Sequence, residues 1–242
     1  KIPLVYPAGE KTIYSDTDYI VLGRLIEEVT GKRLDEYVET EIYQPLGLNH
    51  TVFNPLNKGI SRDQIAATER NGNTRDHRAN FPGIRTYTLL GEVHDEKAFY
   101  SLGGISGHAG LFSRSLDLAV LAQVILNGGG YGDYRLCDTN TLDQFTKTSD
   151  TDVHYGLGWD KNNVWEFGPY ASSRTIGHTG WTGTVTCIDP EHDLAIILLT
   201  NKIHAPVHPD DRDRFVTSRF ETGKYGSIMS LVYEAFLENR SK

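Results

Sequence analysis

A run of five aliphatic residues at 195–199, with the sequence AIILL, restricts the fold more than any other segment of the chain. Successive residues of a strand point to opposite faces of a sheet, so a strand that is apolar throughout fits a central position covered on both sides. The turn-type sequence PEHD at 190–193 comes directly before it, which predicts a hairpin between strands at 183–189 and 194–200. The chain is therefore expected to contain a sheet flanked by helices.

Apolar residues at helical spacing predict the helices that would cover this sheet. They lie at residues 16–30, 34–43, 115–127, 139–146 and 225–238. Ser15 or Asp16 is expected to cap the first helix, because a side-chain oxygen there can accept a bond from a free backbone N–H. Gly31 is expected to end that helix in the left-handed conformation.

The remaining segments complete a mixed architecture. Further strands are predicted at 155–159 and 174–178, and mostly irregular structure is predicted at 46–112 and 204–222. Helices, then an antiparallel sheet, then a closing helix indicate an α+β protein. We expect a mostly helical and loop subdomain over 15–150 and a sheet portion with its closing helix over 151–242.

Charge and cysteine content exclude several classes of function. The 242 residues include 24 Lys+Arg and 32 Asp+Glu, giving a net charge of −8. An acidic chain without a basic stripe argues against nucleic-acid binding. Cys137 and Cys187 form no C-x-x-C pair, so a cysteine zinc site is excluded. The two cysteines could form a disulfide, but we expect two free thiols.

The tripeptide Tyr14-Ser15-Asp16 stands at the mouth of the first predicted helix. The positive end of a helix dipole would favour a phenolate there, which makes Tyr14 a candidate base. Most tyrosines are packing residues, so this position alone is weak evidence for a site.

A glycine-spaced segment at 177–183, with the sequence GHTGWTG, is the second candidate. Glycine at every third position lets a ligand approach the backbone and leaves N–H groups exposed along a strand edge. Such an edge can bind an extended substrate and polarise its carbonyl. The alternative interpretation is a glycine-rich turn next to a bulge.

Two histidine-containing segments have structural interpretations. Residues 94–96, with the sequence HDE, look like a metal cluster, but adjacent residues do not converge on one ion unless they are folded to do so. A surface loop is predicted there instead. His108, in a glycine-dense loop at 103–113, is expected to be a hydrogen-bonded packing residue. No metal or cofactor is predicted.

Taken together, these segments resemble the class C serine β-lactamase and penicillin-binding-protein family. Tyr14-Ser15-Asp16 is similar to the second motif of that family, Tyr-x-Asn, and His178-Thr179-Gly180 is similar to the His variant of its third motif, Lys-Thr-Gly. Further similar segments lie at 19–23, 28–31, 44–48, 107–113 and 201–202. From residue 54 onward the likeness is greatest to penicillin-binding protein 4B-type members of enteric bacteria. The resemblance covers essentially the whole chain and implies a β-lactamase/transpeptidase-like fold.

The first motif of the family, Ser-x-x-Lys, supplies the acylated serine, and no serine of this sequence has a lysine three residues later. In the family this motif precedes the tyrosine motif. The resemblance therefore implies that residues 1–242 form a single, partial domain that lacks the N-terminal strands and the nucleophile helix and is inactive alone. A second departure is Asp16, an acid where the family has a neutral amide that orients the substrate.

The resemblance also assigns roles to individual residues of the complete enzyme. Tyr14, with the missing lysine, takes the proton of the serine, and the backbone N–H of Trp181 is one oxyanion donor. His178 replaces a lysine and holds the tyrosine hydroxyl or a substrate carboxylate. The substrate-binding positions are Asp16, Thr179, Gly180 and Asn201.

The activity that follows is that of a serine acyl hydrolase acting on D-alanyl-D-alanine peptides of peptidoglycan, with β-lactams as ligands. A carboxylesterase on the same fold and a non-catalytic peptidoglycan- or partner-binding protein remain alternatives. The family works outside the cytoplasmic membrane, so a periplasmic location is expected, with any anchor in the missing part. A sheet without its N-terminal strands would expose an edge, so pairing with that segment or with a second copy is expected.

Overall fold

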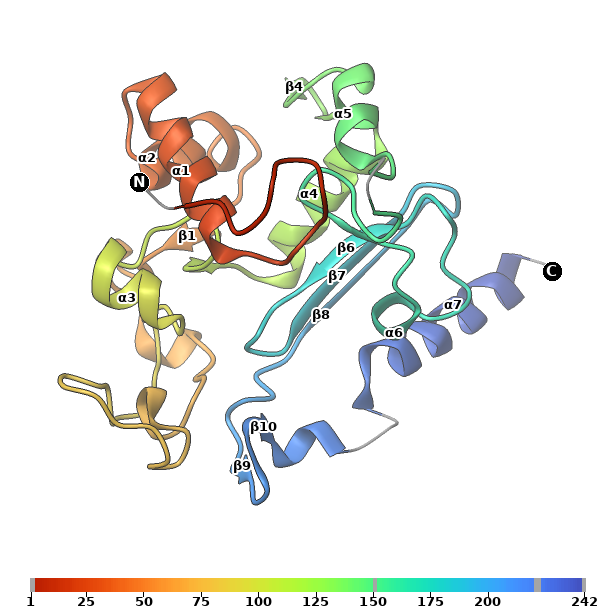
Figure 1. Ribbon diagram of the computed structural model, residues 1–242. Coiled ribbons are helices and arrows are strands. Elements are labelled where there is room, and N and C mark those ends of the chain that lie inside the picture. Colours follow the sequence, from red (N-terminus) through yellow and green to blue (C-terminus); the bar gives the residue numbers. More distant parts are fainter. Residues whose placement is uncertain (1–2, 150–151, 220–222, 241–242) are drawn as a thin grey trace.

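The computed structural model describes residues 3–149, 152–219 and 223–240, and its centre is a four-stranded antiparallel sheet in the order β5-β6-β7-β8 (Figure 1). The strands are β5 (Asp160–Lys161), β6 (Ile176–Thr179), β7 (Thr184–Asp189) and β8 (Leu194–Leu199). The predicted hairpin is confirmed, with Thr184 opposite Leu199 and Asp189 opposite Leu194. The strand expected at 155–159 is wrong: it is reduced to one bridge between Tyr155 and Asp160. Gly158 has a φ of +85° and interrupts extended structure there.

Helices cover both faces of this sheet, as the aliphatic run predicts. The helix α4 (Ser115–Leu126) packs on one face, where Ala122 meets Ile176 and Ile188. The helices α6 (Val164–Phe167) and α7 (Tyr225–Arg240) cover the other. The buried residues on that side are Phe167, Val185, Cys187, Ile196, Met229 and Tyr233. Each such side chain stabilises the fold by roughly 1.5–3 kcal/mol.

The position of β8 within the sheet differs from the prediction. Its neighbouring residues Ala195 and Ile196 pack against opposite faces, so two-sided cover is confirmed. However, β8 is an edge strand, because among the described residues only β7 pairs with it. An apolar strand sequence indicates that both faces of the sheet are covered, but it does not indicate whether a second strand pairs with its edge.

The helical part begins with α1 (Asp16–Thr30), followed by α2 (Leu34–Val38) and the π-helical turn η1 (Glu39–Tyr43). The first helix has its predicted bounds and ends at Gly31, with a φ of +68°. Ser15 occupies the N-cap position but makes no side-chain capping bond. The apolar stripe of α1 is largely uncovered, with Leu22 51 % and Val29 76 % exposed.

The segment 46–112 is mostly irregular, as predicted, but it contains the helix α3 (Glu96–Leu102) and a strand pair. The short elements are β1 (Val52–Phe53) paired with β2 (Leu111–Phe112), η2 (Pro55–Lys58), η3 (Arg62–Gln64) and η4 (Gly72–Thr74). The surface loop expected at 94–96 is wrong. His94 is only 8 % exposed and is hydrogen-bonded to buried Glu69, and Asp95 caps α3 by accepting a bond from the Ala98 N–H.

The irregular stretch expected at 204–222 is also partly wrong. It holds the hairpin of β9 (Val207–His208) and β10 (Asp211–Phe215), then η5 (Val216–Arg219), while 220–222 lie outside the described residues. Val207 and Phe215 bury together with Ile203, which gives this hairpin a small core of its own.

The remaining elements are α5 (Thr139–Thr146), close to its predicted bounds, and the hairpin of β3 (Gly130–Tyr131) and β4 (Tyr134–Arg135). Both cysteines are free thiols, and Cys187 is buried. Within the described ranges, none of the helices has the length and apolar character needed to span a bilayer.

Candidate active site

The glycine-spaced segment forms the end of β6 and the turn into β7. The Gly180 N–H donates to the Thr184 carbonyl oxygen at 2.8 Å, and the Gly183 N–H donates to the Gly180 carbonyl oxygen at 3.0 Å. Gly177 lies where the ring of Phe167 packs against the strand, and a Cβ at Gly177 would come within 2.6 Å of that ring. The glycines therefore allow a close approach of α6 to β6 and a tight turn after it.

His178 and Thr179 hold polar groups at this end of the sheet. His178 Nδ1 donates to the Thr179 carbonyl oxygen at 2.7 Å, so in the neutral ring Nε2 keeps its lone pair as an acceptor. Thr179 Oγ1 donates to Glu166 Oε1 at 3.2 Å. Because successive strand residues point to opposite faces, the two side chains lie on opposite sides of β6, with Thr179 on the side of α6.

Glu166 and Asp160 form a pair of carboxyl groups next to Thr179. Burial, the negative charge of Asp160 and a hydrogen bond between the two carboxyls raise the pKa of Glu166 to about 7, although Thr179 and His178 oppose this shift. Glu166 Oε2 is buried and accepts no hydrogen bond from the described part of the chain. A neutral Glu166 places no charge on this buried oxygen, which is why burial raises its pKa.

Tyr14 is 68 % exposed and lies just before α1. Partial burial, the negative charge of Asp16 and a hydrogen bond to that carboxylate raise the pKa of Tyr14, and Asp160 adds to the effect. This direction is opposite to the phenolate expected from the helix dipole, because burial and the nearby carboxylates favour the neutral hydroxyl and the charge of Lys97 opposes them only in part. Asp160 also raises the pKa of Tyr19, whose hydroxyl lies beside Gly158. The start of α1 thus faces β5.

Asp16 belongs to a polar network that joins α1 to the glycine-dense loop. Its carboxylate pairs with the Lys97 ammonium at 2.5 Å. His108 bonds through Nε2 to Asp95 at 2.9 Å and through Nδ1 to Ser106 at 2.7 Å, which confirms that it is a hydrogen-bonded packing residue. Oxygen and nitrogen atoms of Asp16, Asp95 and His108 lie within 4.8 Å of one another, as metal ligands do, but the Lys97 ammonium already supplies a cation there.

The Ser106–His108–Asp95 chain has the composition of a catalytic triad but lacks its exposure. Ser106 is 7 % exposed, and its loop packs directly under α1, where Gly107 touches the Tyr19 backbone. A nucleophile needs access to its substrate. This chain of hydrogen bonds therefore holds the loop and α1 together.

The other predicted site residues lie in the turns around β6 and β8. The Trp181 side chain is 51 % exposed beneath the guanidinium of Arg75, whose Cζ lies 5.7 Å from the ring centroid. No acceptor within the described ranges takes up the Trp181 backbone N–H, so it has the freedom an oxyanion donor needs. Asn201 Nδ2 donates to the Ala67 carbonyl oxygen at 2.9 Å, which ties the end of β8 to the irregular segment.

The structure brings some of these residues together and leaves others apart. Asp160 is the common neighbour, because its charge acts on both Tyr14 and Glu166, and Glu166 holds Thr179. No hydrogen bond joins His178 to Tyr14 in the described chain. Asp160 and Glu166 were not found from the sequence, because a four-residue helix and a two-residue strand leave no periodic pattern.

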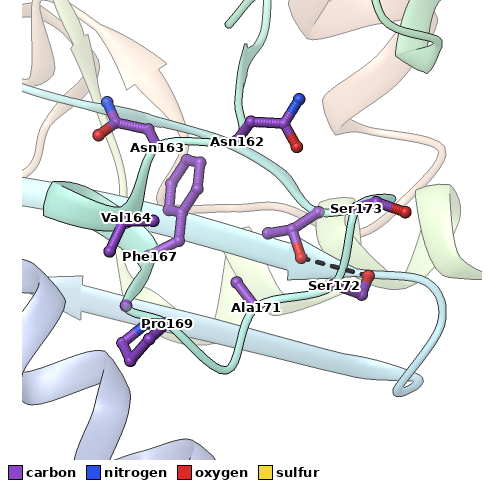
Figure 2. A pocket seen from close by; sticks show the side chains of 10 residues that line it. Asn162, Asn163, Val164, Phe167, Pro169, Ala171, Ser172 and Ser173 are labelled. Atoms are coloured by element: carbon purple, nitrogen blue, oxygen red, sulfur yellow. Dashed lines mark hydrogen bonds between the residues drawn. The ribbon is translucent and has the colours of Figure 1, made fainter. Parts of the chain in front are cut away.

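A separate hollow of about 250 Å³ lies beside α6 and is lined by residues of 162–175 (Figure 2). In this view Asn162 and Asn163 stand above the Phe167 ring, and Ser172 and Ser173 lie to the right. None of the predicted site residues lines this hollow, so it is distinct from the candidate site.

The chain is similar to a protein family and to named bacterial proteins. A family model described as Beta-lactamase matches residues 1–218. A Bacillus subtilis (strain 168) protein named "N-acetylmuramyl-L-alanine amidase" is 55 % identical over 241 residues, covering 97 % of this chain and 55 % of that protein. An Escherichia coli (strain K12) protein named "Putative D-alanyl-D-alanine carboxypeptidase" is 54 % identical over 241 residues, covering 97 % and 56 %. The chain thus spans about half the length of these relatives.

The fold is shared with solved structures. A β-lactamase from Mycobacterium bovis superposes with a TM-score of 0.59 at 18 % identity, covering 96 % of this chain and 67 % of that one. Helices and an antiparallel sheet are arranged alike in the two proteins, which confirms the predicted β-lactamase/transpeptidase-like fold. Since the family model covers most of its length, the chain belongs to the Beta-lactamase family.

Proposed function

We propose that the protein carrying this chain is a serine acyl hydrolase that acts on D-alanyl-D-alanine peptides of peptidoglycan, binds β-lactams, and works outside the cytoplasmic membrane. The observation that carries the proposal is the convergence of Tyr14 and Thr179 on one carboxyl pair, Asp160 and Glu166. The names of the two bacterial relatives, both at about 55 % identity, support a peptidoglycan substrate.

In this proposal the chain supplies the groups that surround a serine it does not contain. Tyr14, whose raised pKa keeps its hydroxyl protonated before the reaction, passes a proton between the serine and the leaving group. The Trp181 N–H stabilises the oxyanion, and His178 Nε2 is an acceptor for a hydroxyl donor of the site. Asp16, held by Lys97, and Asn201, held by the Ala67 carbonyl, border the substrate.

The test is release of D-alanine from a diacyl-L-lysyl-D-alanyl-D-alanine peptide by the full-length gene product. Tyr14→Phe should lower the rate by about 10²–10⁴-fold, the usual contribution of a positioned acid–base group. Tyr131→Phe is the matched control, because Tyr131 is 42 % exposed on the remote hairpin of β3 and β4. If the protein cleaved a p-nitrophenyl ester but released no D-alanine, the proposed activity would be that of an esterase and not of a peptidase. Loss of neither activity in Tyr14→Phe would overturn the proposal.

A further inference from the structure

Thr179 is the donor that this kind of site would offer to a substrate carboxylate, yet its hydroxyl is already engaged. Thr179 Oγ1 donates to Glu166 Oε1 at 3.2 Å, and a hydroxyl has only one proton to donate. While Glu166 is ionised, Thr179 therefore cannot donate to a second anion. The Glu166 carboxylate also repels a second negative charge close to it.

We propose that Glu166 is a specificity-determining residue of the site, which withholds the Thr179 hydroxyl from substrate carboxylates when it is ionised and releases it when it is neutral. The proposal rests on the function proposed above only in taking the end of β6 as the place where substrate binds. A neutral Glu166 can donate its own proton to Thr179 Oγ1, and the threonine proton then turns toward the substrate.

The surroundings of Glu166 allow both states near neutral pH. Its Oε2 is buried without a donor from the described residues, which penalises the ionised form. Asp160 on β5 raises its pKa, whereas His178 and Thr179 on β6 lower it, and the balance lies at about 7. Burial raises the pKa of Tyr155, and the negative charges of Asp160, Asp152 and Glu166 add to this shift.

The pH dependence follows with a definite sign. Above pH 7 Glu166 is ionised and Thr179 is held, so an acyl ligand with a free carboxylate binds weakly. As the pH falls through 7, Glu166 takes up a proton, Thr179 is released, and binding of the carboxylate tightens. The state of Glu166 should not change the affinity for a ligand whose carboxylate is replaced by a carboxamide.

The experiment measures equilibrium binding to the full-length gene product by calorimetry, with N-acetyl-D-alanine and its carboxamide as probes, at pH 6 and pH 8. Glu166→Gln should bind the acid about tenfold or more tightly than wild type at pH 8, the usual effect of regaining one hydrogen bond to a charged group. Its affinity for the carboxamide should not change. Glu191→Gln removes the same charge from an exposed turn and serves as the control.

A second variant assigns the effect to the threonine. In a Thr179→Val background, Glu166→Gln should increase the affinity for the acid only slightly, through the loss of charge alone, because no hydroxyl remains to be released. An unchanged ratio of acid to carboxamide affinity in Glu166→Gln overturns the inference, and so does an equal gain in Glu191→Gln. These binding measurements do not depend on turnover, so they test the inference even if the protein releases no D-alanine. A failure to release D-alanine would count only against the proposed peptidase activity.

Discussion

Replacing Gly177 with alanine should destabilise the protein by about 2–3 kcal/mol, because the new methyl group has no space. Its Cβ would lie 2.6 Å and 2.8 Å from Cε1 and Cζ of Phe167, and it would also collide with the Thr186 carbonyl of β7. Carbon atoms rest at about 3.5–4.0 Å, so the ring or the strand must move by about 1 Å. Phe167 is 1 % exposed and packs with Val185, Cys187 and Met229, so a displaced ring disturbs this core.

The same change should reach the site. Glu166 directly precedes Phe167 in α6, so a displaced ring moves the carboxyl that Thr179 contacts. Misplacement by about 1 Å can cost on the order of 10²-fold in rate. We expect Gly177→Ala to lower both the urea midpoint of the full-length gene product and its rate of acylation.

The control for this prediction is Gly23→Ala in α1. A Cβ there would lie 3.1 Å from the Gly107 nitrogen and 3.2 Å from Leu34 Cδ2, a tight but adjustable contact. The gain in helix propensity of about 1 kcal/mol offsets that crowding, so the midpoint should change little. A Gly177→Ala protein with the urea midpoint of wild type would refute the packing argument.

Two further predictions concern Asp189, which is fully buried and accepts bonds from the Ser172 side chain at 2.6 Å and from the Tyr233 hydroxyl at 2.8 Å. Tyr233→Phe removes one donor from this carboxylate and should lower the unfolding free energy by about 1–3 kcal/mol in urea titrations; an unchanged value would contradict it. Burial alone would raise the pKa of Asp189, but these hydrogen bonds outweigh it and lower the pKa. The carboxylate therefore stabilises the fold fully at a pH above the pKa that Asp189 has in the unfolded chain, and this stabilisation is lost as the pH falls through its pKa in the folded protein. The difference in unfolding free energy between wild type and Asp189→Asn should thus shrink on acidification from pH 6 to pH 3.

The elements that the sequence predicts well are those with a long periodic pattern. Helix α1 is predicted by its apolar spacing and by Gly31, which ends it. The hairpin of β7 and β8 is predicted by its apolar strands and by the turn at 190–193. Helix α3 was missed because its seven residues lie in a stretch rich in turn formers. An Asp95 cap followed by the acidic Glu96 was the signal that could have revealed it.

The polar part of the site could be predicted only in outline. The motifs at Tyr14 and at 178–180 are visible in the sequence, but the group whose charge acts on both Tyr14 and Glu166 is Asp160, at the start of a two-residue strand. Glu166 joins them only because Gly177 lets α6 lie against β6. Contacts between distant short elements depend on packing, which leaves no local sequence signature. For the same reason, the His94 side chain was placed at the surface, although a buried Glu69 pairs with it.

The central claim of the proposal is that this chain supplies the proton-transfer group, Tyr14, and the oxyanion donor, the Trp181 N–H, for a serine that lies outside residues 1–242. Intact-mass spectrometry after incubation with a penicillin tests it most directly, on the full-length gene product and on residues 1–242 side by side. The account predicts a covalent adduct on the full-length protein and none on residues 1–242, which contain no Ser-x-x-Lys. An adduct on residues 1–242, or none on the full-length protein, would contradict it.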